Sequence, residues 1–282
     1  MKRVLSYGGG TDSFAMLLEA LRRGERPDVV VFVDVGDQRG EDPAEWPATY
    51  RHLDEHLRPL LARERIPFEV IDSDRYPVRD ARSLFAWLAA RKQIPVAGPK
   101  RICTRIAKVE RFEAWCADTF PGEQLEVWIG FEAGEEDRAA KDPNAGKPSP
   151  WRFNRFPMIE WGLCRCRSEQ LIRAAGYPVP PKSACVFCPY GTRGDWKRLA
   201  ATEPATFAKI VDLEATKPPT AKNGVKLSIM NFRSKRNPDG SKTYRPDLLP
   251  SFVSKPYAPK RSTCEVCGGP RALKTAGCLE AA

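Results

Sequence analysis

The chain has 282 residues, of which 42% are hydrophobic and 29% are charged, a balance typical of one large globular domain or a domain with an appendage. No apolar run reaches the roughly 18 residues that a membrane helix needs, and the first residues lack a signal-peptide pattern, so we expect a cytoplasmic protein without a membrane partner. The net charge is +10, and +9 of it lies from Lys217 onward, which favours either a polyanionic partner or a solvated tail.

The hydrophobic pattern predicts strands and helices that alternate along the chain. Strands are expected at 2–7, 28–36, 67–73 and 125–131, and helices at 11–24, 45–66, 83–93, 103–120, 167–176 and 195–215. Pro59 should kink or shorten the second helix. Residues 139–156 are rich in Pro, Asn, Gly and Lys and predict a loop. The alternation predicts an α/β fold with a doubly wound, mostly parallel sheet and a cysteine-bearing helical region.

We expect residues 1–200 to form this α/β domain together with a C-x-x-C metal region. Residues 201–282 are expected to form a helical and then basic, Pro-rich extension, because the chain beyond Pro218 shows little periodicity. The segments that follow the strands should meet at one edge of the sheet, where ligands bind in folds of this class.

A glycine-rich stretch, "VLSYGGGTDSF", joins the first predicted strand to the first predicted helix. Glycines allow a close approach of the backbone to a ligand, and amides at a helix N-terminus favour an anion such as a phosphate. The alternative is a tight turn in which Asp12 or Ser13 acts as a helix N-cap. The stretch is neither a Walker motif nor a dinucleotide-binding fingerprint, because their glycine and lysine spacings are absent.

The segment "SYGGGTDS" resembles the pyrophosphate loop, Ser-Gly-Gly-x-Asp-Ser, of the adenine nucleotide alpha-hydrolase superfamily, the PP-loop ATP pyrophosphatases. The resemblance implies that the loop holds the β- and γ-phosphates of ATP and that Asp12 helps to hold Mg²⁺. The residues that would bind the nucleotide in this way are Ser6, Gly8, Gly9, Gly10, Thr11, Asp12 and Ser13.

Four further segments are similar to the phosphoadenosine phosphosulfate reductase-like branch of that superfamily. They are "FVDVGDQ", "ICTRIAKVERFEAW", "GFEAGEEDRA" and "FPMIEW", and with the glycine loop they span roughly residues 2–200 in the order of that branch. The resemblance implies that Asp34 lies near the adenosine, that Arg138 binds phosphate and that Cys103 occupies a cysteine position of the iron–sulfur reductases.

Two departures from the branch bear on the activity. Its reductases usually lack the Asp-Ser ending of the glycine loop, whereas this chain keeps Asp12 and Ser13, which favours cleavage of ATP to AMP and pyrophosphate. The C-terminal Glu-Cys-Gly-x-His motif of the reductases is missing. We therefore predict ATP-dependent adenylation of a nucleic-acid base or nucleotide followed by sulfur transfer. The alternatives are an adenylylsulfate or phosphoadenylylsulfate reductase and a zinc-stabilised nucleic-acid-binding module without turnover.

The nine cysteines form close pairs that are typical of metal binding in a reducing compartment. One hypothesis is a 4Fe–4S cluster on Cys103, Cys185 and Cys188, with an open iron position or with Cys164 or Cys166 as the fourth ligand. The other is a zinc site of four thiolates; its ligands would be Cys164, Cys166, Cys185 and Cys188. A second group near the C-terminus comprises Cys264, Cys267 and Cys278.

The prediction that we adopt assigns catalytic roles to Asp12, Cys103 and Arg138, and metal binding to Cys103, Cys166, Cys185 and Cys188. The expected cofactors are ATP, Mg²⁺ and a 4Fe–4S cluster, with Zn²⁺ as the alternative metal. Expected partners are a nucleic-acid or nucleotide substrate, a sulfur-donor protein and a second copy of the chain. The two histidines, His52 and His56, are four residues apart on a predicted helix, and we favour a solvated helix face over a shared metal.

Overall fold

The structure is a computed structural model of the whole chain. It describes residues 1–37, 40–97, 102–142, 144, 151–218, 228–230, 234–236, 238, 242–244, 248–258, 262–267 and 270–271. Cys278 and most of the basic C-terminal extension lie outside these residues. Within them, no helix is both long enough and apolar enough to cross a membrane.

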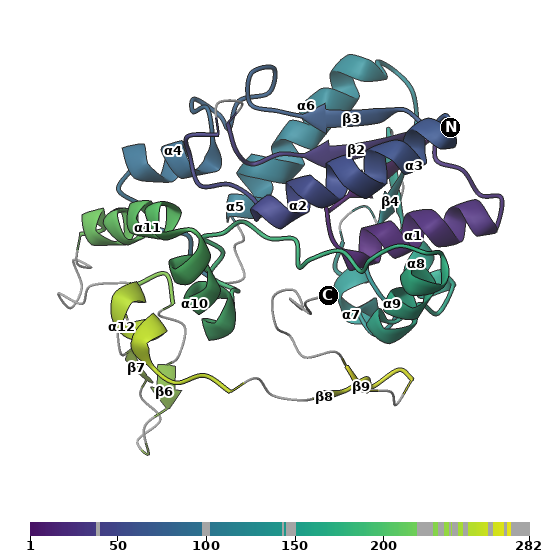
Figure 1. Cartoon of the computed structure of the whole chain (residues 1–282). Helices are drawn as coiled ribbons and strands as arrows, with labels where there is room; N and C mark the ends of the chain where they lie inside the picture. Colours follow the sequence, from purple (N-terminus) through teal and green to yellow (C-terminus); the bar gives the residue numbers. More distant parts are fainter. Residues whose placement is uncertain are drawn as a thin grey trace.

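A sheet of five parallel strands forms the centre of the fold (Figure 1). In chain order the strands are β1 (Lys2–Tyr7), β2 (Val29–Val33), β3 (Phe68–Ile71), β4 (Leu125–Ile129) and β5 (Arg152–Arg155). Their order across the sheet is β3-β2-β1-β4-β5, and every neighbouring pair is parallel. The predicted doubly wound α/β fold is therefore confirmed. The chain winds outward from β1 in both directions, so the order reverses between β1 and β4.

Strand β5 corrects the prediction of an unbroken loop over 139–156. It pairs with the outer side of β4, and Leu125 and Trp128 stand opposite Arg152 and Arg155 in the register. The residues just before β5 have the composition of a loop. The residues that follow form a strand because their backbone can hydrogen-bond to the edge of the sheet at β4.

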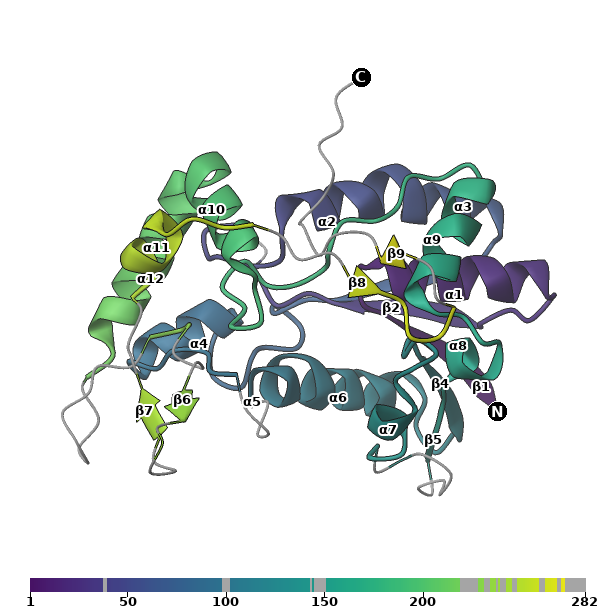
Figure 2. The same ribbon diagram turned by 90° about the horizontal axis from the view of Figure 1, so that it is seen from below.

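Helices cover both faces of the sheet, because successive side chains of each strand point to opposite sides. Leu5 and Tyr7 of β1 pack with α1 (Thr11–Arg22), and this layer continues through the elements α2 (Pro47–His52), η1 (Leu53–Leu57), α3 (Arg58–Arg63), α8 (Pro157–Glu160) and α9 (Arg165–Ala174). Val4 of β1 faces the other side and packs with α6 (Glu110–Thr119). Figure 2 shows the sheet between the two helical layers.

Two of the predicted helices contain a wider π-helical turn. Helix α2 passes through η1 into α3, and the π turn lies directly before Pro59. Proline lacks an amide hydrogen and its ring crowds the carbonyl one turn earlier, so a wider turn relieves the clash without ending the helix. The second helix begins at α5 (Ile102–Thr104) and reaches α6 through the π turn η2 (Arg105–Val109).

A second group of helices packs beside the sheet. It consists of α4 (Leu84–Ala90), α10 (Arg193–Thr202), α11 (Pro204–Thr216) and α12 (Leu249–Ser254). The single helix predicted for 195–215 is two helices, because Pro204 forces Glu203 out of the helical conformation, at φ −134° and ψ 60°. One hydrophobic cluster joins Phe187 and Leu199 to Ile210 and Phe252, so a shared core crosses residue 200. The division into 1–200 and 201–282 stays a prediction.

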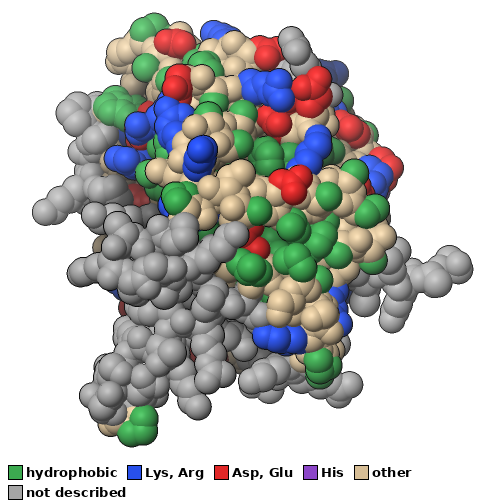
Figure 3. Space-filling model, turned by 90° about the vertical axis from the view of Figure 1, so that its left-hand side faces the viewer, with side chains coloured by type: hydrophobic (Ala, Val, Ile, Leu, Met, Phe, Trp, Pro, Cys, Tyr) green, Lys and Arg blue, Asp and Glu red, His purple; other side chains and the backbone are tan. Residues whose placement is uncertain are grey.

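Short elements complete the fold. Helix α7 (Glu136–Ala139) follows β4, and the hairpin strands are β6 (Ser234–Arg236), β7 (Lys242–Tyr244), β8 (Ser262–Thr263) and β9 (Pro270–Arg271). The β8–β9 hairpin lies against α9, away from β6 and β7 (Figures 1 and 2). On the face formed by the second helical group, basic and acidic side chains are interspersed rather than separated by sign (Figure 3).

Candidate functional site

The glycine loop connects β1 to α1 by a turn that only small residues can make. Gly9 has φ +78°, and a Cβ atom there would lie 2.7 Å from Cγ2 of Thr49 and 3.0 Å from Oγ of Ser183. The left-handed backbone and the close neighbours both require glycine at this position. The loop thus packs against Thr49 and Ser183, which are far away in the sequence.

The loop leaves the first turn of α1 open toward the sheet edge. Gly10 is the N-cap of α1, and no side chain in the described part of the chain caps that turn. Ser13 instead accepts a hydrogen bond from the Gly8 amide at 3.2 Å and donates one to the Gly10 carbonyl at 3.1 Å. Amides in the first turn of a helix have no partner within the helix, so these can bind an anion.

Ser6 and Thr11 flank the loop. Ser6 is half-buried near the end of β1, on the side opposite α1 by the alternation of the strand. Thr11 is buried and donates a hydrogen bond to the Pro180 carbonyl at 3.4 Å. The fold therefore brings all seven predicted loop residues to the carboxyl end of β1, and their binding of a nucleotide stays a prediction.

Asp12 faces an arginine that the sequence analysis did not single out. Arg165 places Nη1 3.3 and 3.4 Å from the two carboxylate oxygens of Asp12. Burial raises the pKa of the Asp12 carboxyl, while Arg165 opposes that rise and nearby Glu135 adds to it. A carboxylate beside the phosphate-binding amides can hold a divalent cation.

The loop lies at the reversal of the strand order, where open α/β sheets bind their ligands. Gly130 follows β4, and a Cβ atom there would lie 3.4 Å from the Ser13 amide nitrogen. Arg138 lies on α7 beyond this point, and it pairs with Glu135 at 3.0 Å and stacks 4.0 Å above the Phe131 ring. The structure thus brings Arg138 to the β4 side of the loop, where it is paired with a carboxylate.

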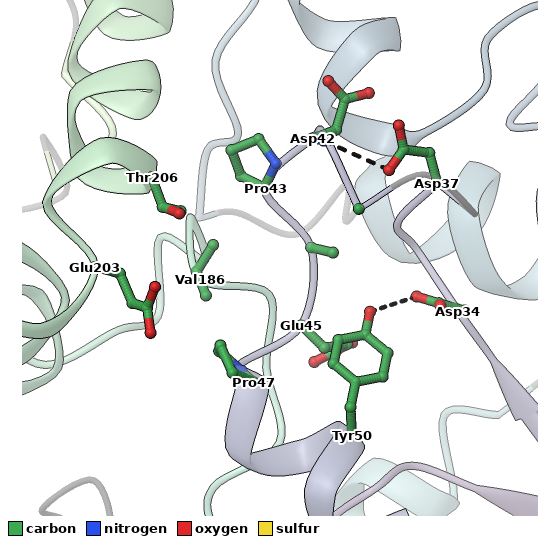
Figure 4. A pocket seen from close by; sticks show the side chains of 12 residues that line it. Asp34, Asp37, Asp42, Pro43, Glu45, Pro47, Tyr50, Val186, Glu203 and Thr206 are labelled. Carbon is green, nitrogen blue, oxygen red and sulfur yellow. Dashed lines mark hydrogen bonds between the residues drawn. The ribbon is translucent and has the colours of Figure 1, made fainter.

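Asp34 ends β2 and borders a cavity of about 400 Å³ (Figure 4). Its Oδ1 accepts hydrogen bonds from the Tyr50 hydroxyl at 2.7 Å and the Gly36 amide at 2.9 Å. Five carboxylates line the cavity, from Asp34, Asp37, Asp42, Glu45 and Glu203. Arg82 pairs with Asp37 and Asp42, and Lys108 pairs with Glu45, so part of this negative charge is compensated.

Cys103, Cys185 and Cys188 form one group of interacting thiols. Burial raises the pKa of the Cys103 thiol to about 11 and also raises the pKa values of the Cys185 and Cys188 thiols. The sequence left open whether cations near Cys103 lower its pKa; in the structure the pKa is raised, first by burial and then by the neighbouring Cys188 thiol. Lys100 and Arg101 of that basic cluster lie outside the described residues.

A partly buried ion pair lies beside these thiols. Lys108 donates to Oε1 of Glu45 at 3.0 Å, and the Glu45 side chain is fully buried. Segment 44–46 runs along segment 184–186, with the Val186 amide 2.8 Å from the Ala44 carbonyl. Both members of the pair act electrostatically on Cys185, in opposite directions.

The thiol group and the glycine loop are joined by one short segment. Ser183 donates a hydrogen bond to the Gly8 carbonyl and touches Gly9 and Gly10. Cys185 follows two residues later, and two residues of extended chain span about 7 Å. The backbone of Cys185 therefore lies at most about 7 Å further along the chain from the loop contact.

Cys166, assigned by sequence to the first thiol group, lies in a second one. Its thiol interacts with those of Cys264 and Cys267, as does that of Cys164. The partners of Cys166 lie 98 and 101 residues later in the chain, in the β8–β9 hairpin. The spacing of cysteines along the sequence does not reveal such a distant contact, so the sequence assignment of Cys166 differs from its place in the structure.

Other residues also differ from the sequence interpretation. His52 is buried rather than solvated, and its Nε2 lies 3.0 Å from the Tyr7 hydroxyl. Arg165, Ser183, Glu45 and Tyr50 are the residues near the site that the sequence analysis missed. Only Arg165 carries a local signal, since it stands between two cysteines in a C-x-C pair.

These features define an α/β protein with a doubly wound parallel sheet, a glycine loop at the reversal of the strand order and two thiol groups. Neither a protein-family model nor a curated protein sequence matches the chain. Among solved structures, the chain is similar to the U34-tRNA thiolase NcsA from Methanococcus maripaludis, described with its 4Fe–4S cluster. The identity is 13%, the TM-score is 0.43, and the match covers 75% of this chain and 70% of that one. A likeness at that level assigns no activity to this chain.

Proposed function

We propose that the chain is a PP-loop ATP pyrophosphatase that adenylates an oxygen of a nucleic-acid base or nucleotide and then replaces that oxygen with sulfur. The observation that carries the proposal is the contact between Ser183 and the glycine loop. Through it, a loop suited to a polyphosphate lies within a few residues of Cys185 and Cys188, whose thiols interact electrostatically with that of Cys103. Neither part alone distinguishes this activity from nucleotide binding or from a structural metal site.

The glycine loop would bind the polyphosphate of ATP. The first-turn amides of α1 would bind the phosphates, and Asp12 would help to hold Mg²⁺, which would offset their charge. The substrate carbonyl oxygen attacks the α-phosphorus, the bond to the β,γ-pyrophosphate breaks, and the amides and cations stabilise the charge that develops on pyrophosphate. Arg165 lies within reach of both Asp12 and this charge.

Sulfur transfer would follow at the same place. A sulfide nucleophile adds to the adenylated carbon, AMP departs with the former carbonyl oxygen, and loss of a proton leaves a thiocarbonyl. Adenylation is needed because an oxygen bonded to carbon is a poor leaving group, whereas AMP is a good one. The step needs a sulfur donor of the class of inorganic sulfide.

The donor set of the first thiol group fits an iron–sulfur cluster with an open position. Three thiols, from Cys103, Cys185 and Cys188, come together from two segments, and Lys108 supplies a cation that offsets thiolate charge. A bound 4Fe–4S cluster would supply an iron at which sulfide can be held. The cysteines themselves would position that sulfide toward the glycine loop.

The test is pyrophosphate release by protein purified without oxygen, with ATP, Mg²⁺ and sulfide, and with tRNA, DNA or nucleoside monophosphates as separate acceptors. We expect release with one acceptor class and a thiolated product in the same reaction. Asp12→Ala should reduce release at least 100-fold, in line with the loss of a transition-state contact. Asp54→Ala is the matched control, because Asp54 is also paired with an arginine, Arg58, but lies on the exposed helix surface.

The outcomes separate the candidate activities. Pyrophosphate release that survives Asp12→Ala would remove the glycine loop from the reaction. Sulfite release from an adenylylated sulfate without pyrophosphate release would instead favour the reductase alternative.

A further inference from the structure

Three thiols of the second group lie close enough together to share one metal ion. The sulfur atoms of Cys164, Cys264 and Cys267 all lie within 4.8 Å of one another. Cys166 belongs to the same group, because its thiol is hydrogen-bonded to those of Cys264 and Cys267. Four thiolates around one zinc ion at about 2.3 Å are separated by about 3.8 Å, so a small contraction of the group would complete a tetrahedron.

Backbone amides are directed at two of these sulfur atoms. The amides of Val266 and Cys267 donate to Cys264, and the amide of Arg167 donates to Cys164. These bonds hold the two sulfur atoms in fixed positions next to the other thiols of the group. The β8–β9 hairpin thus brings the sulfur atoms of Cys264 and Cys267, its C-x-x-C pair, close to one another.

Within the part of the chain that the structure describes, the group has little apolar packing of its own. Buried Cys164 and Cys264 cluster with Ala133, and Cys166 packs against them. A hairpin of two-residue strands with so small a core needs another source of stability. A structural metal is the usual source in small folds of this kind, since binding free energy then becomes folding free energy.

The group also joins three segments that are distant in the sequence. Cys164 and Cys166 begin α9, the hairpin lies against α9, and Ala133 follows β4. Val266 contacts the same segment, because its Cγ2 lies 3.1 Å from the position of a Cβ atom on Gly134. The cysteine group therefore connects the β8–β9 hairpin to α9 and to the segment that follows β4.

We propose that Cys164, Cys166, Cys264 and Cys267 together bind one structural Zn²⁺ ion, separate from any cluster on Cys103, Cys185 and Cys188. Four protein thiolates close the coordination sphere, which is the arrangement of structural and not catalytic zinc. A polynuclear iron–sulfur cluster would hold its thiolates farther apart than a single ion does, because iron and sulfide lie between them. The proposal does not depend on ATP binding or on sulfur transfer.

The test is the zinc and iron content per chain of the full-length protein and of three variants. We expect about one zinc in the wild type and almost none in Cys264→Ser/Cys267→Ser. Cys185→Ser should keep its zinc, and so should Cys116→Ala, the matched control in which a buried thiol from neither group is changed. Undiminished zinc in the double variant, or zinc lost with Cys185 instead, would overturn the proposal.

A second measurement does not require the double variant to fold. Cys185→Ser is stripped of zinc and titrated with Co²⁺, whose visible bands and ultraviolet charge-transfer band report a tetrahedral thiolate site. One equivalent of Co²⁺ with this spectrum, displaced by Zn²⁺, is expected, and X-ray absorption of the zinc protein should give four sulfur neighbours at about 2.3 Å. Failure to bind Co²⁺, or a single iron in these thiols in place of zinc, would overturn the proposal. Absence of pyrophosphate release would count against the proposed activity alone.

Discussion

Arg165 reaches Asp12 of the glycine loop across 3.3 Å, and it does so from between two cysteines of the second thiol group. Cys164 and Cys166 are its immediate neighbours in the chain. A metal on those cysteines would fix the backbone that carries the arginine. The C-terminal hairpin and the first turn of α1 are thereby linked through one side chain.

Arg165→Ala is expected to weaken the binding of Mg²⁺–ATP about tenfold, the loss of one charge-assisted hydrogen bond. This expectation depends on the proposed function, and titration calorimetry with a non-hydrolysable ATP analogue measures it. Arg167→Ala is the matched control, because Arg167 lies two residues further along α9 and bonds the Gly162 carbonyl at 3.3 Å. Equal affinities in the two variants would contradict a role of Arg165 at the nucleotide.

Cys264→Ser/Cys267→Ser should also weaken the binding of the analogue, provided that the metal acts by positioning Arg165. In the Arg165→Ala background the same double substitution should then change the affinity little, since the group through which it acts is gone. Additive losses of affinity in the combined variant would mean that the hairpin affects the loop by another route.

Gly9→Ala should destabilise the protein more than Gly24→Ala. Both glycines have a positive φ, +78° and +72°, so alanine strains the backbone at each position by roughly 1–2 kcal/mol. At Gly24 the new methyl group has open space, whereas at Gly9 it would lie 2.7 Å from Thr49, which adds an overpacking cost of about 1–3 kcal/mol. Urea unfolding of the two variants measures the difference in the free energy of unfolding. Equal shifts would show that the loop relaxes around the added methyl group.

The sequence predicted the parts of the fold and site that depend on local residue patterns. The run from β1 through the glycines into α1 carries its own signals: a partly apolar strand, three glycines of which Gly9 has a positive φ, and Asp12 in the first helical turn. The doubly wound sheet followed from the alternation of strands and helices. The role of Asp34 near an adenosine, which the family resemblance implies, stays a prediction, and in the structure Asp34 borders a cavity.

The sequence did not predict features that depend on partners elsewhere in the chain. Strand β5 exists because β4 offers it an edge, and its own residues, two arginines flanking Phe153 and Asn154, carry no clear strand pattern. The assignment of cysteines to the two thiol groups also depends on distant partners, since Cys166 meets Cys264 only once the chain has folded. Ser183 had no local signal, because its hydroxyl bonds a carbonyl 175 residues earlier.

Cys185→Ser is expected to abolish iron binding and product thiolation while leaving the affinity for the ATP analogue within about twofold. The thiol group needs Cys185 as one of its three donors, whereas Ser183 and the glycine loop keep their contact. Iron and acid-labile sulfide are measured on protein purified without oxygen, with Cys116→Ala as the control. Full iron retention in Cys185→Ser would refute the assignment of this ligand.

The stability of the protein should fall as the pH is lowered from about 6.5 to about 4, and His52 should contribute to that fall. Burial depresses the pKa of His52 from 6.5 to about 4, with a smaller contribution from His56. Between these pH values His52 binds a proton in the unfolded chain but stays neutral in the folded chain. The free energy of unfolding therefore decreases, as the pH is lowered, by at most about 1.4 kcal/mol per pH unit. Above the unfolded pKa both states are neutral, and the contribution of His52 is constant.

His52→Gln separates this contribution from those of the carboxylates, because glutamine can still bond the Tyr7 hydroxyl but does not titrate. Urea unfolding at several pH values should give a shallower slope for the variant than for the wild type between pH 4 and 6.5. His56→Gln is the matched control, because His56 lies one helical turn away and its side chain is 28% exposed. A wild-type slope that His52→Gln leaves unchanged would mean that His52 is protonated in the folded protein as readily as in the unfolded chain.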